Sequence, residues 1–407
     1  MSAVIGLRCR ECSRRYPAEP LSICEYCFGP LEVEYDYDLA RATMTREAVE
    51  AGPSSLWRYR ALLPSKEGPA VDLGAGFTPL RRARRLGEAL GIDELWLKDD
   101  TVNPTGSFKD RVVTVAVTVA REFGFDTVAC ASTGNLANAT AAYAAASGLE
   151  AFIFIPADLE RVKVVTTAAF GANVVAIKGN YDDVNRLCSE VADAFPWAFV
   201  NVNVRPYYAE GSKTLGFEVA EQLGWRLPDH VVVPIASGAL LTKIHRGFRE
   251  LVELGLIEDR DVRISGAQAT GCSPVSAAFK EGADHVRPVK PDTIAKSLAI
   301  GNPADGYYAM TTARETGGAI EDVSDEEIVD AITLLARTEG LFAETAGGVT
   351  IGTLKKLREA GVIRADERVV AYVTGVGFKT IEALEERVGV TMTVSPSLEE
   401  FTDQLNR

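Results

Sequence analysis

The chain has 407 residues, 47% of them hydrophobic and 25% charged, which suits a globular protein of about two domains. Its formal net charge of −14 argues against a general nucleic-acid-binding role, because phosphate backbones are held by cationic surfaces. We find no run of about eighteen uncharged apolar residues, and residues 1–10 hold too short an apolar stretch for a secretory signal. Seven cysteines are an odd number, and four of them lie in two CxxC pairs, which fits a reducing cytoplasm better than a disulfide framework. We therefore expect a cytoplasmic protein with neither a nucleic-acid nor a membrane partner.

The first informative pattern is a pair of CxxC motifs within residues 1–35, a segment without helical periodicity. Two such motifs can present four thiolates at the corners of a tetrahedron, as in a zinc ribbon. The segment is too short to bury a core, so a bound metal would supply its stability. Four cysteine ligands leave no open coordination position, which predicts a structural Zn²⁺ ion. The alternative is a set of free thiols in a module that has lost its metal. The predicted metal ligands are Cys9, Cys12, Cys24 and Cys27.

Residues 36–70 form a connecting region with a predicted short helix near 43–51, and strand-like and helix-like segments alternate from about residue 72. Strands are predicted at 95–98, 127–131, 151–155, 173–177, 198–202, 230–235, 263–267 and 369–374. Helices are predicted at 136–147, 181–194, 214–223, 240–254, 325–337 and 349–359. This alternation predicts an α/β fold with a mostly parallel sheet covered by helices on both faces. Ligands of such sheets bind beyond the carboxyl ends of the strands.

Residues 103–111, with the sequence NPTGSFKDR, place a lysine just after a tight turn. Ser107 can cap the helix that follows, which puts Lys109 in its first turn. Backbone N–H groups and an apolar environment at that position favour the neutral amine, the form that makes Schiff bases. The alternative is a solvated lysine at a helix start.

Two further turns follow predicted strands and precede predicted helices. Residues 132–135 (STGN) place polar side chains at the edge of the sheet, and residues 234–242 (PIASGALLT) combine small residues with a helix start that favours an anion. Thr374 ends the last predicted strand and is followed by two nearby glycines. Each feature also has an ordinary structural explanation, as a helix cap, a simple turn or a threonine bonded to its own backbone.

Together these segments resemble the fold-type II pyridoxal-phosphate enzymes of the tryptophan synthase β-like superfamily, and most closely the threonine synthases. Residues 103–111 match the cofactor-lysine motif. The order and spacing of further segments agree, namely 55–59 (SLWRY), 74–80 (GAGFTPL), 131–135, 210–214 (EGSKT), 300–303 (IGNP) and 374–377 (TGVG).

The resemblance implies a zinc-ribbon-like module at 1–35, a catalytic body at 36–390 and a C-terminal tail at 391–407. Within the body, a small α/β subdomain of about residues 95–205 would be inserted in a large one of about 52–94 and 206–390. Two mostly parallel open sheets with helices on both faces would form these subdomains.

For the cofactor, the resemblance implies pyridoxal 5′-phosphate bound to Lys109, with Phe108 beside it. Asn135 would donate a hydrogen bond to the ring hydroxyl. Thr374 would pair with the pyridine nitrogen and leave it largely neutral. The residues implied at the cofactor phosphate are Ser237, Gly238, Ala239, Leu240 and Thr242. This loop departs from the family pattern, which is richer in Gly and Asn, although backbone donors do not need those side chains.

The reaction implied is conversion of O-phospho-L-homoserine and water to L-threonine and phosphate, by γ-elimination and β-addition of water. The freed amine of Lys109 would act as the base. Candidate substrate-binding residues are Ser107, Ser132, Thr133, Asn203, Arg205 and Lys213.

Residues 205–208 read Arg-Pro-Tyr-Tyr where many family members have Asn-Pro-Tyr-Arg, so Tyr208 replaces the family's phosphate-binding arginine. Arg205 could restore the bidentate phosphate contact, signal a different leaving group, or form a surface ion pair.

Two other functions remain open from the sequence. One is a related lyase or synthase of the same fold, such as a serine/threonine dehydratase or a cysteate synthase. The other is a zinc-ribbon binding protein with an inert enzyme body. For the favoured enzyme we expect a small phosphorylated amino-acid substrate as partner and a homodimer as assembly.

Overall fold

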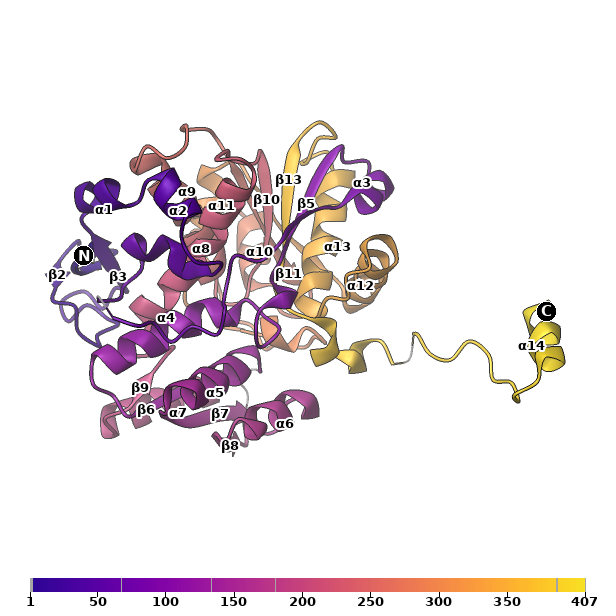
Figure 1. Cartoon of the computed structure of the whole chain (residues 1–407), viewed down its shortest axis with the longest axis horizontal. Helices are drawn as coiled ribbons and strands as arrows, with labels where there is room; N and C mark the ends of the chain where they lie inside the picture. Colours follow the sequence, from indigo (N-terminus) through magenta and orange to yellow (C-terminus); the bar gives the residue numbers. More distant parts are fainter. Residues whose placement is uncertain (1–2, 67, 133, 180, 386, 407) are drawn as a thin grey trace.

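The computed structural model describes residues 3–66, 68–132, 134–179, 181–385 and 387–406. Three sheets organise this part of the chain: a three-stranded sheet at the N-terminus, a six-stranded sheet and a four-stranded sheet (Figure 1). The two larger sheets carry helices on their faces, which confirms the predicted α/β fold with two open sheets.

The six-stranded sheet has the order β12-β11-β10-β13-β5-β4, and its strands run parallel except for β4, which is antiparallel to β5. The strands are β4 (Leu80–Arg82), β5 (Glu94–Asp99), β10 (His230–Pro234), β11 (Arg263–Ala269), β12 (Ile320–Val323) and β13 (Arg368–Val373). Successive residues of β10 belong to different cores: Val231 and Val233 pack on one face of the sheet and Val232 on the other. This alternation is why both faces need a layer of helices.

One face of this sheet is covered by α8 (Arg205–Gln222), α9 (Ala239–Glu253), α10 (Pro274–Lys280) and α11 (Gly306–Glu315). The other face is covered by α3 (Arg84–Leu90), α12 (Asp325–Glu339) and α13 (Thr345–Glu359). The sequence predicted α8 only from residue 214, whereas the helix begins at Arg205. It is buried on nearly all sides, so it lacks the apolar stripe by which an amphipathic helix is recognised.

The four-stranded sheet has the order β8-β7-β6-β9 and is parallel throughout. Its strands are β6 (Thr127–Ala131), β7 (Glu150–Pro156), β8 (Asn173–Ile177) and β9 (Ala198–Phe199). Its helices are α4 (Lys109–Glu122), α5 (Asn135–Ser147), α6 (Arg161–Ala169) and α7 (Tyr181–Ala194), of which α4 also packs on α8 of the larger unit. The strand expected at 95–98 is β5 of the six-stranded sheet, so the strands of the smaller sheet begin only at Thr127.

The N-terminal module is an antiparallel sheet of β1 (Val4–Cys9), β2 (Arg15–Tyr16) and β3 (Leu31–Tyr35), in the order β2-β1-β3. It lies against the body beside α8 (Figure 1). The connecting region holds two short helices instead of the one predicted, α1 (Tyr37–Thr43) and α2 (Arg46–Glu50). Asp36 and Thr45 cap them, and two caps close together divide the segment.

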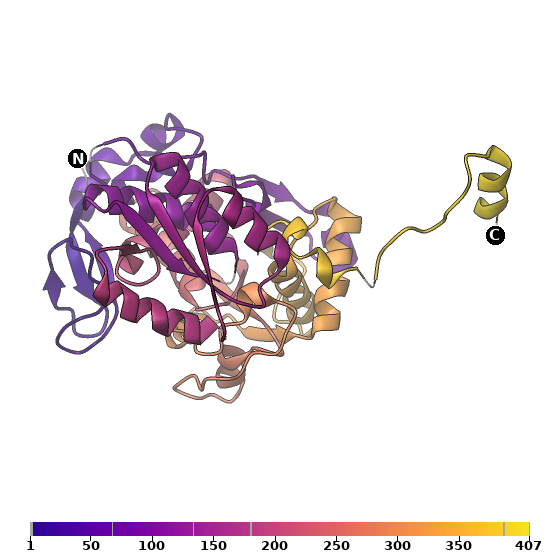
Figure 2. The same cartoon turned by 90° about the horizontal axis from the view of Figure 1, so that it is seen from below.

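Short 3₁₀ helices complete the chain: η1 (Leu56–Leu62), η2 (Asp100–Val102), η3 (Lys296–Leu298), η4 (Gly377–Lys379) and η5 (Ile381–Ala383). The last helix, α14 (Leu398–Leu405), stands apart from the body at the end of an extended segment in both views (Figures 1 and 2). Within the described ranges, no helix has both the length and the apolar character needed to cross a bilayer.

A buried ion network fixes α4 against α8. The Arg111 guanidinium donates to Asp100 of η2, with Nε 2.6 Å from Oδ2, and to Glu218 of α8, with Nη2 2.8 Å from Oε2. Lys98 Nζ lies 2.6 Å from the same Glu218 carboxylate. All four side chains are buried. The network therefore sets the position of the first turn of α4, where Lys109 lies.

Candidate active site

A cleft of about 330 Å³ lies where carboxyl ends of strands from both larger sheets meet, which is the expected ligand site of parallel α/β sheets. Its walls come from the residues after β6, β10 and β13 and from the first turns of α4, α5, α8 and α9. Of the residues predicted to bind the cofactor, all except Thr242 line it: Phe108, Lys109, Asn135, Ser237, Gly238, Ala239, Leu240 and Thr374.

Lys109 is the first residue of α4 and lies in the wall of the cleft, as predicted. Its Nζ donates to the Tyr208 hydroxyl at 3.0 Å and lies 4.5 Å from the centre of the Phe108 ring. Burial lowers the pKa of Lys109 to about 8, against the opposing effect of the Glu344 carboxylate. The neutral amine that attacks a carbonyl is therefore accessible near physiological pH.

The turn before Lys109 differs in one detail from expectation. Phe108, not Ser107, is the N-cap residue of α4, and no side chain caps this helix. Ser107 instead pairs through its backbone with Gly375, and its Oγ is buried without a hydrogen-bond partner among the described residues. The predicted capping role of Ser107 is therefore wrong, because its backbone is engaged in pairing with the segment after β13.

This pairing brings Thr374 to the lysine. The Phe108 amide donates to the Thr374 carbonyl at 2.9 Å, and the Val376 amide donates to the Gly106 carbonyl at 3.0 Å. Gly106 has φ +73°, and a Cβ there would lie 2.8 Å from Val376 Cγ1, so the turn requires glycine. Thr374 lines the cleft at the end of this paired segment.

Asn135, the first residue of α5, belongs to a chain of polar contacts that the sequence did not reveal. Its Nδ2 donates to both oxygens of Glu344, at 2.9 and 3.0 Å, and its Oδ1 accepts from Lys379 Nζ at 3.1 Å. Burial lowers the pKa of Lys379 to about 8, with Glu344 and Asp110 acting in the opposite direction. These contacts fix the orientation of the Asn135 carboxamide.

The loop after β10 forms an anion cradle. Ser237 and Gly238 lead into α9, whose first residues, Ala239 and Leu240, also line the cleft. The first N–H groups of a helix have no intrahelical acceptor and attract anions. Gly238 has φ +100°, and a Cβ there would lie 2.5 Å from the Asp305 carbonyl oxygen. Thr242 lies one turn further on, and its hydroxyl donates to the Ala239 carbonyl within the helix.

These residues fit pyridoxal phosphate. A buried amine of lowered pKa, a helix N-terminus for the phosphate, an amide at Asn135 and a hydroxyl at Thr374 share one cleft. The groups that would hold the cofactor are therefore contributed by both larger sheets, and binding it would tie the two units together.

Of the residues predicted to bind substrate, Ser132 and Arg205 line the cleft. Ser132 Oγ accepts from the amides of Gly134 and Ala137, at 2.9 and 2.8 Å, so it also caps α5. The Arg205 guanidinium donates to the Asp305 carboxylate. Burial opposes the charge on Arg205, but Asp305 outweighs it and raises the pKa, so the side chain stays cationic.

The other candidates do not meet in the cleft. Asn203 bonds to the backbone of β9 and its neighbour Trp197, and Lys213 Nζ is buried between the carboxylates of Glu210 and Glu250. Ser107 is buried and does not line the cleft, and Thr133 lies outside the described residues. Lys213 does not reach the cleft because it lies on the face of α8 that packs on α9. The cleft face of α8 carries Arg205, Tyr208 and Ser212.

Several lining residues were not predicted as part of the site. The spacing of Arg205, Tyr208 and Ser212, three and four residues apart, is a signal that could have found the cleft face of α8. Others come from distant segments and carry no such signal. The additional polar and apolar lining residues are Ser22, Ile23, Tyr181, Asp182, Asn185, Asn201, Asn302 and Glu344.

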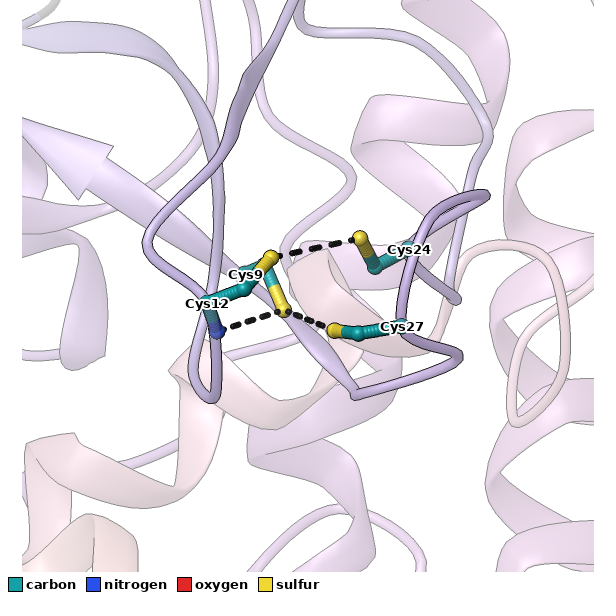
Figure 3. Close-up of side chains that lie close together, drawn as sticks. All are labelled: Cys9, Cys12, Cys24 and Cys27. Carbon is teal, nitrogen blue, oxygen red and sulfur yellow. Dashed lines mark hydrogen bonds between the residues drawn. The ribbon is translucent and has the colours of Figure 1, made fainter.

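The four N-terminal cysteines form a compact cluster (Figure 3). Their sulfur atoms lie within 4.8 Å of one another, with Cys9 and Cys27 at 3.4 Å and Cys12 and Cys24 at 3.6 Å. All are free thiols. Tetrahedral zinc with Zn–S bonds of about 2.3 Å separates its sulfur ligands by about 3.8 Å, so the cluster fits zinc. The Cys12 amide also points at the Cys9 sulfur, at 3.5 Å.

Comparisons with known proteins agree with this geometry. Residues 71–375 match the family model described as pyridoxal-phosphate dependent enzyme. The chain is 40% identical to the threonine synthase of Methanocaldococcus jannaschii, over 94% of this chain and 96% of that protein. It is 41% identical to the threonine synthase of Methanosarcina acetivorans, over 91% of each chain.

Solved structures share the fold at lower identity. A fungal L-serine ammonia-lyase from Rhizomucor miehei superimposes with a TM-score of 0.65 at 21% identity, covering 76% of this chain and 96% of that one. Diaminopropionate ammonia lyase from Escherichia coli gives a TM-score of 0.65 at 18% identity, covering 78% and 89%. The catalytic body thus has the fold of these enzymes, and the chain belongs to the pyridoxal-phosphate-dependent enzymes and, among them, to the threonine synthase family.

Proposed function

We infer that the protein is a threonine synthase, which converts O-phospho-L-homoserine and water to L-threonine and phosphate. The observation that carries this conclusion is identity of about two residues in five with threonine synthases over more than nine-tenths of the chain, together with an intact Lys109 cleft. When bound, pyridoxal phosphate supplies the electron sink that stabilises negative charge at the substrate carbons.

The protein's own residues would handle the protons. Lys109 would act as the base: its neutral Nζ would take the α-proton, pass that proton on, and only then take a β-proton. The Tyr208 hydroxyl lies 3.0 Å from this nitrogen, and burial raises its pKa, so it stays protonated and can hold the amine in place. Glu344 and Lys379 fix the orientation of the Asn135 amide at the cleft.

We propose that Arg205 and Ser132 receive the substrate phosphate. Arg205 is the cation of α8 that faces the cleft. The backbone N–H of its partner Asp305 donates a hydrogen bond to the Ser237 carbonyl of the cofactor-phosphate loop at 2.8 Å. A planar guanidinium suits a phosphate ester better than an ammonium group does. Asn203 and Lys213 have no part in this proposal because their side chains are bonded elsewhere, and Ser107 has none because it does not line the cleft.

The test is a side-by-side assay of three reactions: phosphate release from O-phospho-L-homoserine, ammonia release from threonine or serine, and sulfite incorporation with phosphoserine. We expect phosphate and threonine to form in equal amounts in the first. Absence of turnover with O-phospho-L-homoserine, with activity in either other assay, would assign a related lyase or synthase instead.

We also propose a cytoplasmic homodimer with a structural zinc ion in the N-terminal module. Exposed apolar side chains of α14, Leu398 and Leu405, support an assembly in which they are covered, and the seven free thiols suit a reducing compartment. Sedimentation analysis, cell fractionation and metal analysis of the purified protein test the three parts separately.

The proposed organisation is a metal module at 1–35, a catalytic body at 36–390 and a tail at 391–407. The smaller unit of the body is built on the four-stranded sheet after β5.

A further inference from the structure

Part of the cleft wall comes from the N-terminal cysteine module. Ser22 and Ile23, the two residues before Cys24 of the cysteine cluster, line the cleft. Ile23 is an apolar side chain that is 54% exposed, yet its backbone is fixed by pairing with Pro30 across the second CxxC loop. The module therefore presents this side chain to the cleft, and the cysteine cluster determines where it lies.

The module also contacts the first turn of α8. The Tyr207 hydroxyl donates to the Glu19 carbonyl, between the two CxxC motifs, at 2.8 Å. Tyr207 is buried and lies between two residues that face the cleft, Arg205 and Tyr208. A shift of the Glu19 segment would therefore be transmitted directly to the proposed phosphate ligand.

A second contact reaches the first turn of α11. The Tyr308 hydroxyl donates to the carboxylate of Glu11, which lies inside the first CxxC motif. The Arg10 guanidinium lies over the same ring, 3.6 Å from its centre. Tyr308 follows Asp305 by three residues, and Asp305 is the partner of Arg205.

The Tyr207 contact thus holds the start of α8, and the Tyr308 contact holds the start of α11. Arg205 and Asp305, which form an ion pair, lie at these two helix starts. We propose that the metal-bound module is a positioning and specificity element of the active site: it closes one side of the cleft with Ser22 and Ile23 and fixes the Arg205–Asp305 pair for the substrate phosphate. This inference rests on the proposed function. It assigns to Tyr207, Tyr308 and Ile23 a role in substrate binding that a purely stabilising module would not have.

A bound metal would act on the cleft through the segments of the module that surround it. A sheet of three short strands has little core of its own, so the positions of Glu11, Glu19 and Ile23 depend on the cysteine cluster. Loss of metal should loosen the cleft wall without removing Lys109 or the cofactor-phosphate loop, which belong to the body.

The test compares Ile23→Glu with Ile5→Glu in the full-length holoenzyme. Both isoleucines belong to the module and are similarly exposed, at 54% and 55%, but only Ile23 lines the cleft. A carboxylate at position 23 faces the incoming phosphate, so we expect the KM for O-phospho-L-homoserine to rise about tenfold or more, with kcat changed less than about twofold. Ile5→Glu should leave both values unchanged. Equal KM values in the two variants would overturn the inference.

A second comparison avoids turnover. Inorganic phosphate is titrated calorimetrically into the holoenzyme before and after zinc is withdrawn, with released zinc counted by a chromogenic chelator and bound cofactor followed by its absorbance. We expect phosphate affinity to fall at least about fivefold while the cofactor stays bound, and Tyr308→Phe to weaken phosphate binding where Tyr307→Phe does not. Unchanged phosphate affinity after zinc loss would refute the role.

Failure of the proposed function and failure of the role assigned to the module give different results. A wild-type protein that does not turn over O-phospho-L-homoserine contradicts the proposed function, whereas the phosphate affinities of the Ile23 and Ile5 variants still decide whether the module shapes the cleft.

Discussion

At the scale of single residues, the site depends on how burial changes the chemistry of amines. Lys109 and Lys379 both have pKa values lowered to about 8, in each case chiefly by burial, although carboxylates lie nearby. The sequence predicted this for Lys109, because its turn and helix start are local features. It could not predict Lys379 or Glu344, since their contacts with Asn135 depend on the meeting of three distant segments.

The pH dependence of cofactor loading follows from the lowered pKa of Lys109. In the apoprotein the neutral amine increases as pH rises through about 8, the folded pKa. The rate of pyridoxal-phosphate binding, followed by absorbance, should therefore rise with pH and level off above about 9. A rate that keeps rising toward about 10.5, the value of an unperturbed lysine, would contradict this environment.

Substitution of Lys379 tests the orientation of Asn135. Lys379→Met removes the donor to Asn135 Oδ1 and one of the two lysines that lie near the buried Glu344. We expect cofactor affinity to fall about tenfold or more, with a shifted absorbance band of the bound cofactor. Lys355→Met, on the exposed face of α13, serves as the control and should bind the cofactor normally. Equal affinities in the two variants would remove Lys379 from the site.

At the scale of elements, the cleft is lined largely by residues that follow buried strands. That is why the sequence could group Asn135, residues 237–240 and Thr374 at one edge: each follows a Val- or Ala-rich strand within a few residues. It could not predict which face of α8 meets the cleft, because that helix is buried on nearly all sides. Lys213 was accordingly assigned to the cleft when it belongs to a buried ion cluster.

The start of α9 provides a test of the anion cradle. Gly238→Ala places a Cβ 2.5 Å from the Asp305 carbonyl oxygen, at a backbone φ of +100°. The loop must move to relieve this contact, so cofactor affinity should fall by about tenfold or more. Gly282→Ala also has positive φ but no heavy atom within 4 Å of the added Cβ, and we expect it to retain the cofactor. Equilibrium dialysis of both variants makes the comparison.

The network between α4 and α8 is expected to dominate local stability. Arg111→Met leaves the buried carboxylates of Asp100 and Glu218 without their main cation. Breaking a buried pair in this way should lower the free energy of unfolding by about 3–5 kcal/mol, measured by urea denaturation. Arg121→Met, on the exposed end of the same helix, should change it by less than about 0.5 kcal/mol. A small effect at position 111 would show that the network is not needed to hold α4.

At the scale of the whole molecule, three units meet at one cleft. The strand–helix alternation predicted mostly parallel sheet structure and the CxxC spacing predicted the cysteine cluster, because both are periodic or local signals, whereas the division into two sheets was implied by the family resemblance. Neither signal shows that the module reaches the cleft through Ser22 and Ile23. That contact depends on how the surfaces of separate units pack. The same holds for β5, which lies in the larger sheet although it precedes the strands of the smaller one.

The proposed reaction depends on Lys109 carrying the cofactor. Borohydride reduction of the native protein, followed by proteolysis and mass spectrometry, tests it directly. We expect a pyridoxyl group on Lys109 and none on Lys379, a second buried lysine whose pKa is lowered to about 8. An unmodified Lys109, or an adduct on a different lysine, would contradict it.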